Sequence, residues 1–127
     1  MIKVLLDTNF LMIPYVYKID IFQEIERLIP ESHEIFIPSN VLEELRGLSN
    51  SKGKEKIAAQ VAIQLIEKKS VKKIQSQSGV DEFMINFAVE NKPNVVVCTN
   101  DKELKKRLKE VHIPVIVMRG RNRLEFY

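Results

Sequence analysis

Short apolar runs alternate with longer segments of helical periodicity along the whole chain. The runs are rich in branched aliphatic residues and are bounded by polar residues or proline, which predicts buried strands. These runs comprise 2–6, 34–37, 95–98 and 115–118. Between them, apolar positions recur at the spacing of an α-helix. The expected helices comprise a short one after residue 7, then 20–29, 40–49, 54–69, 80–90, and one that starts at 99–101 and ends near 111.

Apolar strands that alternate with helices favour a parallel sheet covered on both faces. Right-handed crossovers then place helices on either side. We therefore expect an α/β/α sandwich around a central parallel sheet of four to five strands, with residues 71–75 fitting either an edge strand or a loop. The chain has 127 residues and no internal repeat or linker, so we expect a single domain over residues 1–127. The polar stretch at 75–78 is expected to be a surface loop.

The composition narrows the class of protein. The single cysteine, Cys98, cannot build a disulfide framework, and its place at the end of an apolar run favours a small buried side chain. The N-terminus lacks the pattern of an export signal, so the cytoplasm is the expected compartment. No apolar run approaches the roughly 20 residues that span a bilayer, so we expect no membrane-embedded part.

Charge is distributed in blocks. The net charge is only +3, but residues 1–45 hold three Lys and Arg against eight Asp and Glu, and residues 46–73 hold eight against two. Residues 74–101 hold one against four, and residues 102–123 hold eight against two. Such blocks suggest an acidic locus flanked by basic surface that attracts a polyanion, although most basic helix faces are simply solvated. The candidate residues for binding such a polyanion, an RNA strand if the acidic locus belongs to a nuclease, are Arg46, Lys52, Lys54, Lys102, Lys105, Arg119 and Arg121.

Two aspartates follow predicted strands. In an open α/β sheet, functional groups gather beyond the carboxyl ends of the strands. Asp7 and Asp101 lie at such positions. Each also suits a purely structural role, because an aspartate in this place can cap the free N–H groups of the following helix.

Two further acids are selected by helical geometry. Glu44 falls at the border of the apolar face of the 40–49 helix, whereas Glu43 points away and can form a capping box with Asn40. Asp81 lies within the apolar face of the 80–90 helix, and Glu82 lies opposite. Asp81 has a structural alternative as well, as the third residue after an N-cap Ser78.

Clustered carboxylates must hold protons or bind a cation. An all-oxygen donor set favours Mg²⁺ or Mn²⁺ over zinc, and neither His33 nor His112 lies in a ligand-spaced motif. Carboxylate-held Mg²⁺ is a common arrangement for attack on a phosphodiester. The acids and the basic blocks together predict a metal-dependent hydrolase that acts on a long phosphodiester chain.

Four segments, in order along nearly the whole chain, resemble a PIN domain. They comprise Leu5–Asn9, Val41–Leu48, Val80–Met84 and Val96–Lys105. The closing part, with Thr99–Asp101 and Ile113–Val115, is similar to the PIN nucleases of small-subunit ribosomal RNA processing and less similar to VapC-type toxins.

The resemblance implies an acidic pocket that binds Mg²⁺ or Mn²⁺ and endonucleolytic cleavage of RNA that leaves a 3′-hydroxyl. The acidic positions of the family map onto Asp7, Glu44, Asp81 and Asp101. Its small polar residues, which steady the carboxylates, match Asn9 and either Thr99 or Asn100. Whether Glu82 or Glu43 shares in the site stays open.

RNA is the expected partner, with a ribosomal precursor as one substrate, and self-association into a homodimer is compatible with the sequence. Two other functions stay open. One is a VapC-type toxin ribonuclease, and the other is a catalytically inactive RNA-binding or assembly module on the same fold.

Overall fold

One six-stranded sheet forms the centre of the computed structural model, which describes residues 1–77 and 79–127. The strand order is β3-β2-β1-β4-β5-β6, in which the first five strands are parallel and β6 runs antiparallel to β5. The strands are β1 (Ile2–Leu6), β2 (His33–Pro38), β3 (Lys72–Ile74), β4 (Val95–Cys98), β5 (Val115–Arg119) and β6 (Arg123–Phe126).

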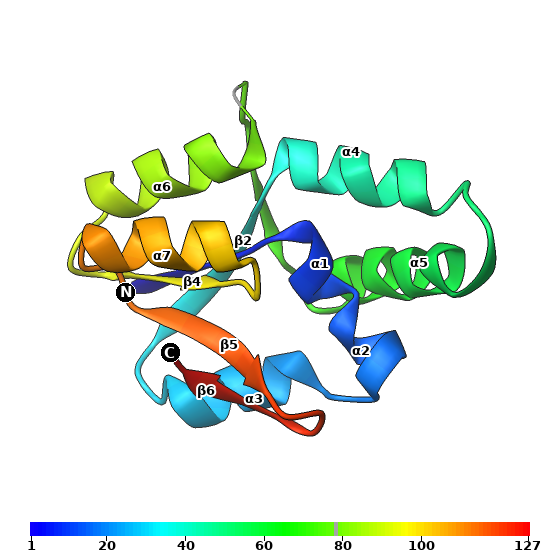
Figure 1. The fold of residues 1–127 in the computed structure, drawn as a ribbon, viewed down its shortest axis with the longest axis horizontal. Coiled ribbons are helices and arrows are strands. Elements are labelled where there is room, and N and C mark those ends of the chain that lie inside the picture. The colour runs from blue at the N-terminus through cyan, green and yellow to red at the C-terminus, as the bar shows by residue number, and fades with distance from the viewer. Residues whose placement is uncertain (78) are drawn as a thin grey trace.

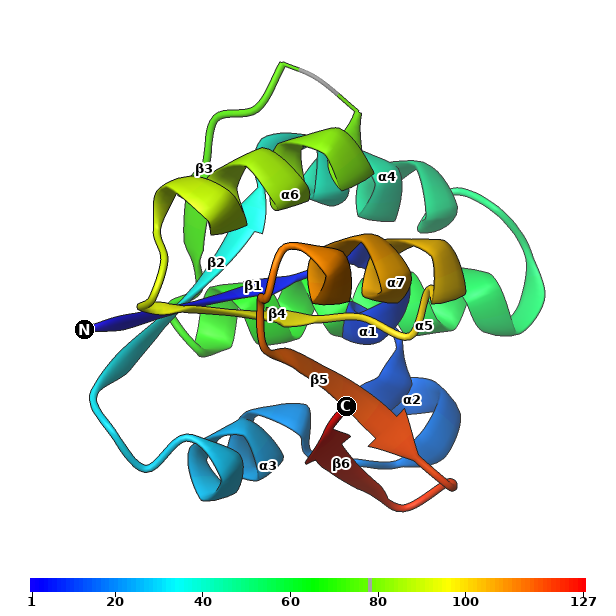
Figure 2. The same ribbon diagram turned by 60° about the vertical axis from the view of Figure 1, so that its left-hand side comes forward.

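Helices cover both faces of this sheet. Helices α6 and α7 lie over one face, and α3 and α5 lie over the other (Figures 1 and 2). The helices are α1 (Thr8–Leu11), α2 (Ile13–Tyr17), α3 (Ile21–Leu28), α4 (Ser39–Leu48), α5 (Gly53–Lys68), α6 (Val80–Glu90) and α7 (Lys102–Glu110). The expected α/β/α sandwich is therefore confirmed. Within the described part of the chain, no helix is long and apolar enough to cross a membrane.

The core explains why the central strands stand out in the sequence. Val4, Leu5 and Leu6 of β1 are fully buried, and all four residues of β4 are buried. A strand with helices on both faces cannot alternate apolar and polar side chains, so it is apolar throughout. Cys98 is one of these buried residues, as expected, and burial raises the pKa of its thiol.

The sheet has six strands, where the sequence predicted four or five. The segment at 71–75 is an edge strand, β3, rather than a loop. The sixth strand, β6, was missed because it has only four residues, two of them charged. It is held from outside the sheet: Leu124 N donates to Glu24 Oε1 at 2.9 Å, and Arg27 Nη2 donates to the Leu124 carbonyl at 2.8 Å.

Of the helix caps predicted from the sequence, two are confirmed and one is wrong. Asp7 and Asp101 each cap a helix, through Phe10 N and Leu104 N at 2.8 Å. The capping box of Asn40 with Glu43 is wrong, because the N-cap position is held by Pro38, two residues before Asn40. Asn40 instead accepts a 2.8 Å hydrogen bond from the Ser76 hydroxyl. The N-cap position of α6 belongs to Gly79, and Ser78 lies outside the described residues.

Candidate active site

The four acids selected from the sequence come together in one pocket. Strands β1 and β4 are neighbours in parallel register, with Leu6 beside Cys98, so their carboxyl ends deliver Asp7 and Asp101 to the same edge of the sheet. The early turns of α4 and α6 add Glu44 and Asp81. The resulting acidic pocket has a volume of about 140 Å³ and is lined by Asp7, Thr8, Asn9, Glu44, Val80, Asp81 and Asp101.

Asp7 is the buried member of this acidic pocket, with 7% of its surface exposed. Its Oδ1 accepts from Phe10 N, and its Oδ2 accepts from the Thr99 hydroxyl. Burial raises the pKa of Asp7 to about 6, the two hydrogen bonds oppose that rise, and the negative charges of Asp101 and Asp81 add to it. The hydrogen bonds in the pocket therefore do not fully offset the cost of burying the negative charge of Asp7.

Thr99 connects two of the acids. Its side chain is fully buried, and its hydroxyl donates to Asp7 while it accepts from the backbone N of Asp101 at 3.1 Å. The other supporting residues differ in place. Asn9 lines the acidic pocket, whereas Asn100 accepts from Met118 N at 2.8 Å and so ties the loop after β4 to β5. Of the predicted supporting residues, Thr99 thus binds the Asp7 carboxylate and the backbone of Asp101, whereas Asn100 holds the sheet.

In each pair of adjacent acids, Asp81 with Glu82 and Glu43 with Glu44, only one member lines the acidic pocket. Asp81 lines the acidic pocket, whereas Glu82 accepts from Arg107 Nη2 at 2.8 Å. Partial burial first, and then the charges of Asp101, Glu44 and Glu82, raise the pKa of Asp81, while Arg107 opposes the rise. Glu44 also lines the pocket and accepts from the Thr8 hydroxyl, whereas Glu43 is exposed and lines none of the described pockets.

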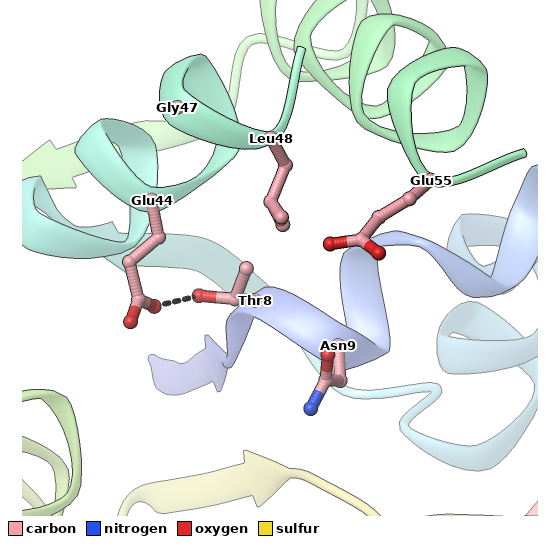
Figure 3. A pocket seen from close by; sticks show the side chains of 6 residues that line it. All are labelled: Thr8, Asn9, Glu44, Gly47, Leu48 and Glu55. Atoms are coloured by element: carbon pink, nitrogen blue, oxygen red, sulfur yellow. Dashed lines mark hydrogen bonds between the residues drawn. The ribbon is translucent and has the colours of Figure 1, made fainter. Parts of the chain in front are cut away.

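Thr8 is a site residue that the sequence analysis missed. Its hydroxyl holds Glu44, and its side chain lines the acidic pocket. Only its position between Asp7 and Asn9 could have suggested this role, since a threonine in a first helical turn has many uses. Glu55 was missed as well. It reaches a second, larger pocket of about 410 Å³ that shares Thr8, Asn9 and Glu44 with the acidic pocket (Figure 3).

The donor set fits a hard divalent cation. It consists of carboxylates with nearby hydroxyl and amide oxygens, the ligands that Mg²⁺ and Mn²⁺ prefer. Among the described residues, no ion pair involves any of the four acids. In the same part of the chain, no three His, Cys, Asp or Glu side chains stand close enough together to hold an ion as they are. The acids therefore converge on one pocket without forming a closed coordination shell.

Six of the seven candidate RNA-binding residues are exposed and Lys105 is half-buried, and two of the seven contact neighbouring side chains. Lys105 Nζ lies 4.9 Å from the centre of the Tyr127 ring, and Arg119 pairs with Glu125 at 3.2 Å. The others occupy the surface of α4, the start of α5, the start of α7 and the turn between β5 and β6. They are Arg46, Lys52, Lys54, Lys102 and Arg121.

Comparison with known proteins identifies the family and the fold of this chain. Two archaeal relatives match most of the chain: "Ribonuclease VapC4" of Methanocaldococcus jannaschii, 43% identical over all of this chain and 98% of its own, and "Ribonuclease VapC9" of Archaeoglobus fulgidus, 36% identical over 86% and 77%. Among solved structures, the PIN domain endonuclease Utp24 superposes with a TM-score of 0.81 at 22% identity, over 98% of this chain and 90% of that one. A domain of a functionally unknown protein from M. jannaschii reaches 0.59 at 20% identity, over 94% and 93%.

The family model described as "PIN like domain" matches residues 4–121, which include all four acids of the pocket. The resemblance seen in the sequence is thereby confirmed. This chain belongs to the PIN-like domain family.

Proposed function

We propose that this protein is an endoribonuclease that hydrolyses RNA phosphodiester bonds with Mg²⁺ or Mn²⁺ held by Asp7, Glu44, Asp81 and Asp101. The observation that carries the proposal is the gathering of these four acids, none of them in an ion pair of the described structure, in one pocket. Four neighbouring carboxylates are costly unless a cation compensates them. The names of the relatives, which are ribonucleases, support RNA as the substrate class.

The side chains of this chain have separate tasks in the proposed reaction. Thr8 orients Glu44, and Thr99 orients Asp7 while it holds the backbone at Asp101. A divalent cation bound here would neutralise the scissile phosphate and lower the pKa of the attacking water. The carboxylates are the acceptors that can hold that water by hydrogen bonds and orient it toward phosphorus. Exposed lysines and arginines would hold the flanking phosphates.

Cleavage of a labelled RNA tests the proposal. We expect cleavage with Mn²⁺, none with a chelator, and a loss of at least about 100-fold in Asp7→Asn, which leaves the cation without its buried charged ligand. Asp20→Asn is the matched control, because Asp20 is also an N-cap aspartate, bonded to Gln23 N at 3.1 Å, and does not line the acidic pocket. Cleavage that is indifferent to the chelator and to Asp7→Asn would contradict the proposal.

The neighbouring acids provide a second pair of controls. Glu44→Gln and Asp81→Asn are expected to lose activity, whereas Glu43→Gln and Glu82→Gln keep it, because only the first two line the acidic pocket. An inactive RNA-binding module would instead bind RNA in a salt-dependent way and show no turnover in any of these proteins.

Of the two cellular roles expected from the sequence, the relatives favour a VapC-type ribonuclease. Both curated matches carry that name, one of them at 43% identity. The likeness to Utp24, at 22% identity, concerns the fold alone and gives ribosomal RNA processing no separate support. Sequencing the RNA ends that form when the wild-type protein, but not Asp7→Asn, is induced in a bacterial host would distinguish cleavage of ribosomal precursors from cleavage of other RNA.

A further inference from the structure

The second pocket adjoins the acidic pocket and has no part in the proposed hydrolysis. We define this side pocket by its lining residues, which are Thr8, Asn9, Glu44, Gly47, Leu48 and Glu55. We propose that it binds one nucleobase next to the scissile phosphate and that Glu55 selects guanine. This inference rests on the proposed function, since it assumes that RNA lies across the acidic pocket.

The position of the side pocket suits the neighbouring nucleotide. Thr8, Asn9 and Glu44 line both pockets, so the two cavities share a wall. A strand with one phosphate at the carboxylates therefore has an adjacent base within reach of that wall. The volume of about 410 Å³ lies within the range of small-molecule sites.

One side of the side pocket is lined by an apolar side chain, Leu48, and by a glycine, Gly47, which leaves space open there. Leu48 extends from α4 into the space between Glu44 and Glu55 (Figure 3). Gly47 stands beside it, and a Cβ built on Gly47 would meet no heavy atom within 4 Å. Single-stranded RNA is recognised by splayed bases whose faces stack on side chains while their edges form hydrogen bonds, and here the apolar side chain of Leu48 is the surface against which a base face can pack.

Glu55 supplies the edge recognition. It lies in the first turn of α5, directs its carboxylate into the side pocket, and takes part in no ion pair among the described residues. A carboxylate only accepts hydrogen bonds, and its two oxygens suit two parallel N–H donors. Guanine presents such a pair, N1–H and the 2-amino group, on one edge. Adenine and cytosine present a single amino group there, and uracil a single N–H.

Binding of short RNA in the presence of a chelator tests the inference without turnover. The probes are fluorescent five-nucleotide RNAs, uridine throughout except for guanosine, inosine or adenosine at the centre. Inosine keeps N1–H but lacks the 2-amino group. The wild-type protein is expected to bind the guanosine probe at least roughly fivefold more tightly than the inosine probe, as for loss of a hydrogen bond to a charged group.

Two variants assign that preference to the side pocket. In Glu55→Gln the guanosine-to-inosine ratio of affinities is expected to fall to about one, because the amide offers one acceptor and one donor in place of two acceptors. Gly47→Leu fills the pocket at a position with free space. It is expected to lower the affinity for the guanosine probe until it approaches the affinity for the adenosine probe. Glu43→Gln, on the same helix as Gly47 and outside both pockets, is the control and is expected to keep the wild-type ratio.

Equal affinities of the wild-type protein for the guanosine and inosine probes would overturn the inference, and so would a ratio that Glu55→Gln leaves unchanged. These outcomes are separate from failure of the proposed function. If the protein cleaves RNA but shows no guanine preference in binding, only the proposal that the side pocket selects guanine is rejected. A guanine preference in binding without metal-dependent cleavage would reject only the nuclease.

Discussion

Asp7 combines two properties that seldom coincide in an aspartate, namely burial and a negative charge that its neighbours only partly compensate. It is 7% exposed, its pKa is raised to about 6, and two hydrogen bonds to its oxygens only partly offset the cost of removing it from water. A carboxylate of this kind lowers the stability of the metal-free fold and is the natural place for a cation to restore it. The consequence is a measurable dependence of stability on pH and on metal.

The free energy of unfolding of the metal-free protein is expected to fall as Asp7 ionises. The pKa of this carboxyl is 3.8 in an unfolded chain and about 6 in the folded protein. At pH values between these two, the folded chain therefore binds the proton more tightly than the unfolded chain does. The stability gained from that proton is complete below pH 3.8 and is lost as the pH rises through 6. Asp7→Asn should therefore be more stable than the wild type at about pH 7.5, by about 1–3 kcal/mol, and lose this advantage toward about pH 4.

Urea unfolding in the presence of a chelator, at several pH values, measures this difference. Asp20→Asn is the control for changing a capping aspartate elsewhere. Adding Mn²⁺ should stabilise the wild type more than Asp7→Asn, because a ligand that binds only the folded state shifts unfolding by mass action. A variant no more stable than the wild type at about pH 7.5 would show that burial of this charge costs nothing.

Thr99 is expected to act as a positioning residue for Asp7. Thr99→Val keeps the shape and removes the hydroxyl, so Asp7 loses one hydrogen bond and its pKa rises further. We expect a loss of about 10- to 100-fold in activity or metal affinity, as is usual when a residue that orients a metal ligand is removed. Thr99→Ser keeps the hydroxyl and should therefore keep the wild-type activity and metal affinity. Carbon-detected titration of the Asp7 carboxyl follows the pKa directly, and an unchanged pKa in Thr99→Val would refute the role.

The secondary structure elements differ in how far they can be predicted from local sequence. Strands β1 and β4 are apolar because both faces are covered, and α3 is amphipathic because one side faces the core, so pattern alone locates them. Strand β6 could not be found in this way, because side chains of α3, about 100 positions away in the chain, hold it at the sheet edge. The N-cap of α4 was misplaced for a similar reason, since the Asn40 side chain accepts a hydrogen bond from Ser76, 36 positions away in the chain.

Glu24→Ala is expected to loosen β6. Glu24 accepts from Leu124 N and pairs with Arg27, which itself donates to the Leu124 carbonyl. The hydrogen bond from Arg27 lowers the pKa of Glu24, so this stabilisation is present above the ordinary pKa of 4.5 and is lost as the pH falls through the lower folded value. We expect a loss of about 1–2 kcal/mol at neutral pH, because one hydrogen bond to a charged group and a partly exposed ion pair disappear.

Hydrogen exchange at the Leu124 amide gives the local readout for this change. Glu26→Ala is the matched control, because Glu26 lies on the same helix and is exposed. Exchange at Leu124 that is equally slow in both variants would mean that β6 is held by its pairing with β5 alone.

Across the whole molecule, an acidic pocket is embedded in a chain of net charge +3 whose basic residues fall in two blocks. The sequence predicted the four acids of the pocket because each follows a strand or lies in an early helical turn on an inward-tending side. It could not predict Thr8 as the partner of Glu44, because that hydrogen bond joins residues 36 positions apart. The same limit applies to Glu55, which reaches the side pocket only through the packing of α4 against α5.

The salt dependence of RNA binding is expected to report on the basic block at the start of α5. The double variant Lys52→Gln and Lys54→Gln should weaken binding and reduce the slope of log affinity against log salt by up to about 1.4, at roughly 0.7 for each phosphate of single-stranded RNA that a lysine no longer neutralises. Lys68→Gln with Lys69→Gln, at the other end of the same helix, is the control. An unchanged slope in the first variant would place the RNA elsewhere on the surface.

The link from Thr99 to Asp7 bridges 92 positions of the chain. Under the proposed function, a polypeptide still being synthesised carries Asp7, Glu44 and Asp81 before strand β4, Thr99 and Asp101 exist. Such a nascent chain has no assembled cleavage centre. The messenger and the ribosome that produce this nuclease are therefore spared from it until residues 99–101 have been synthesised and have folded against Asp7.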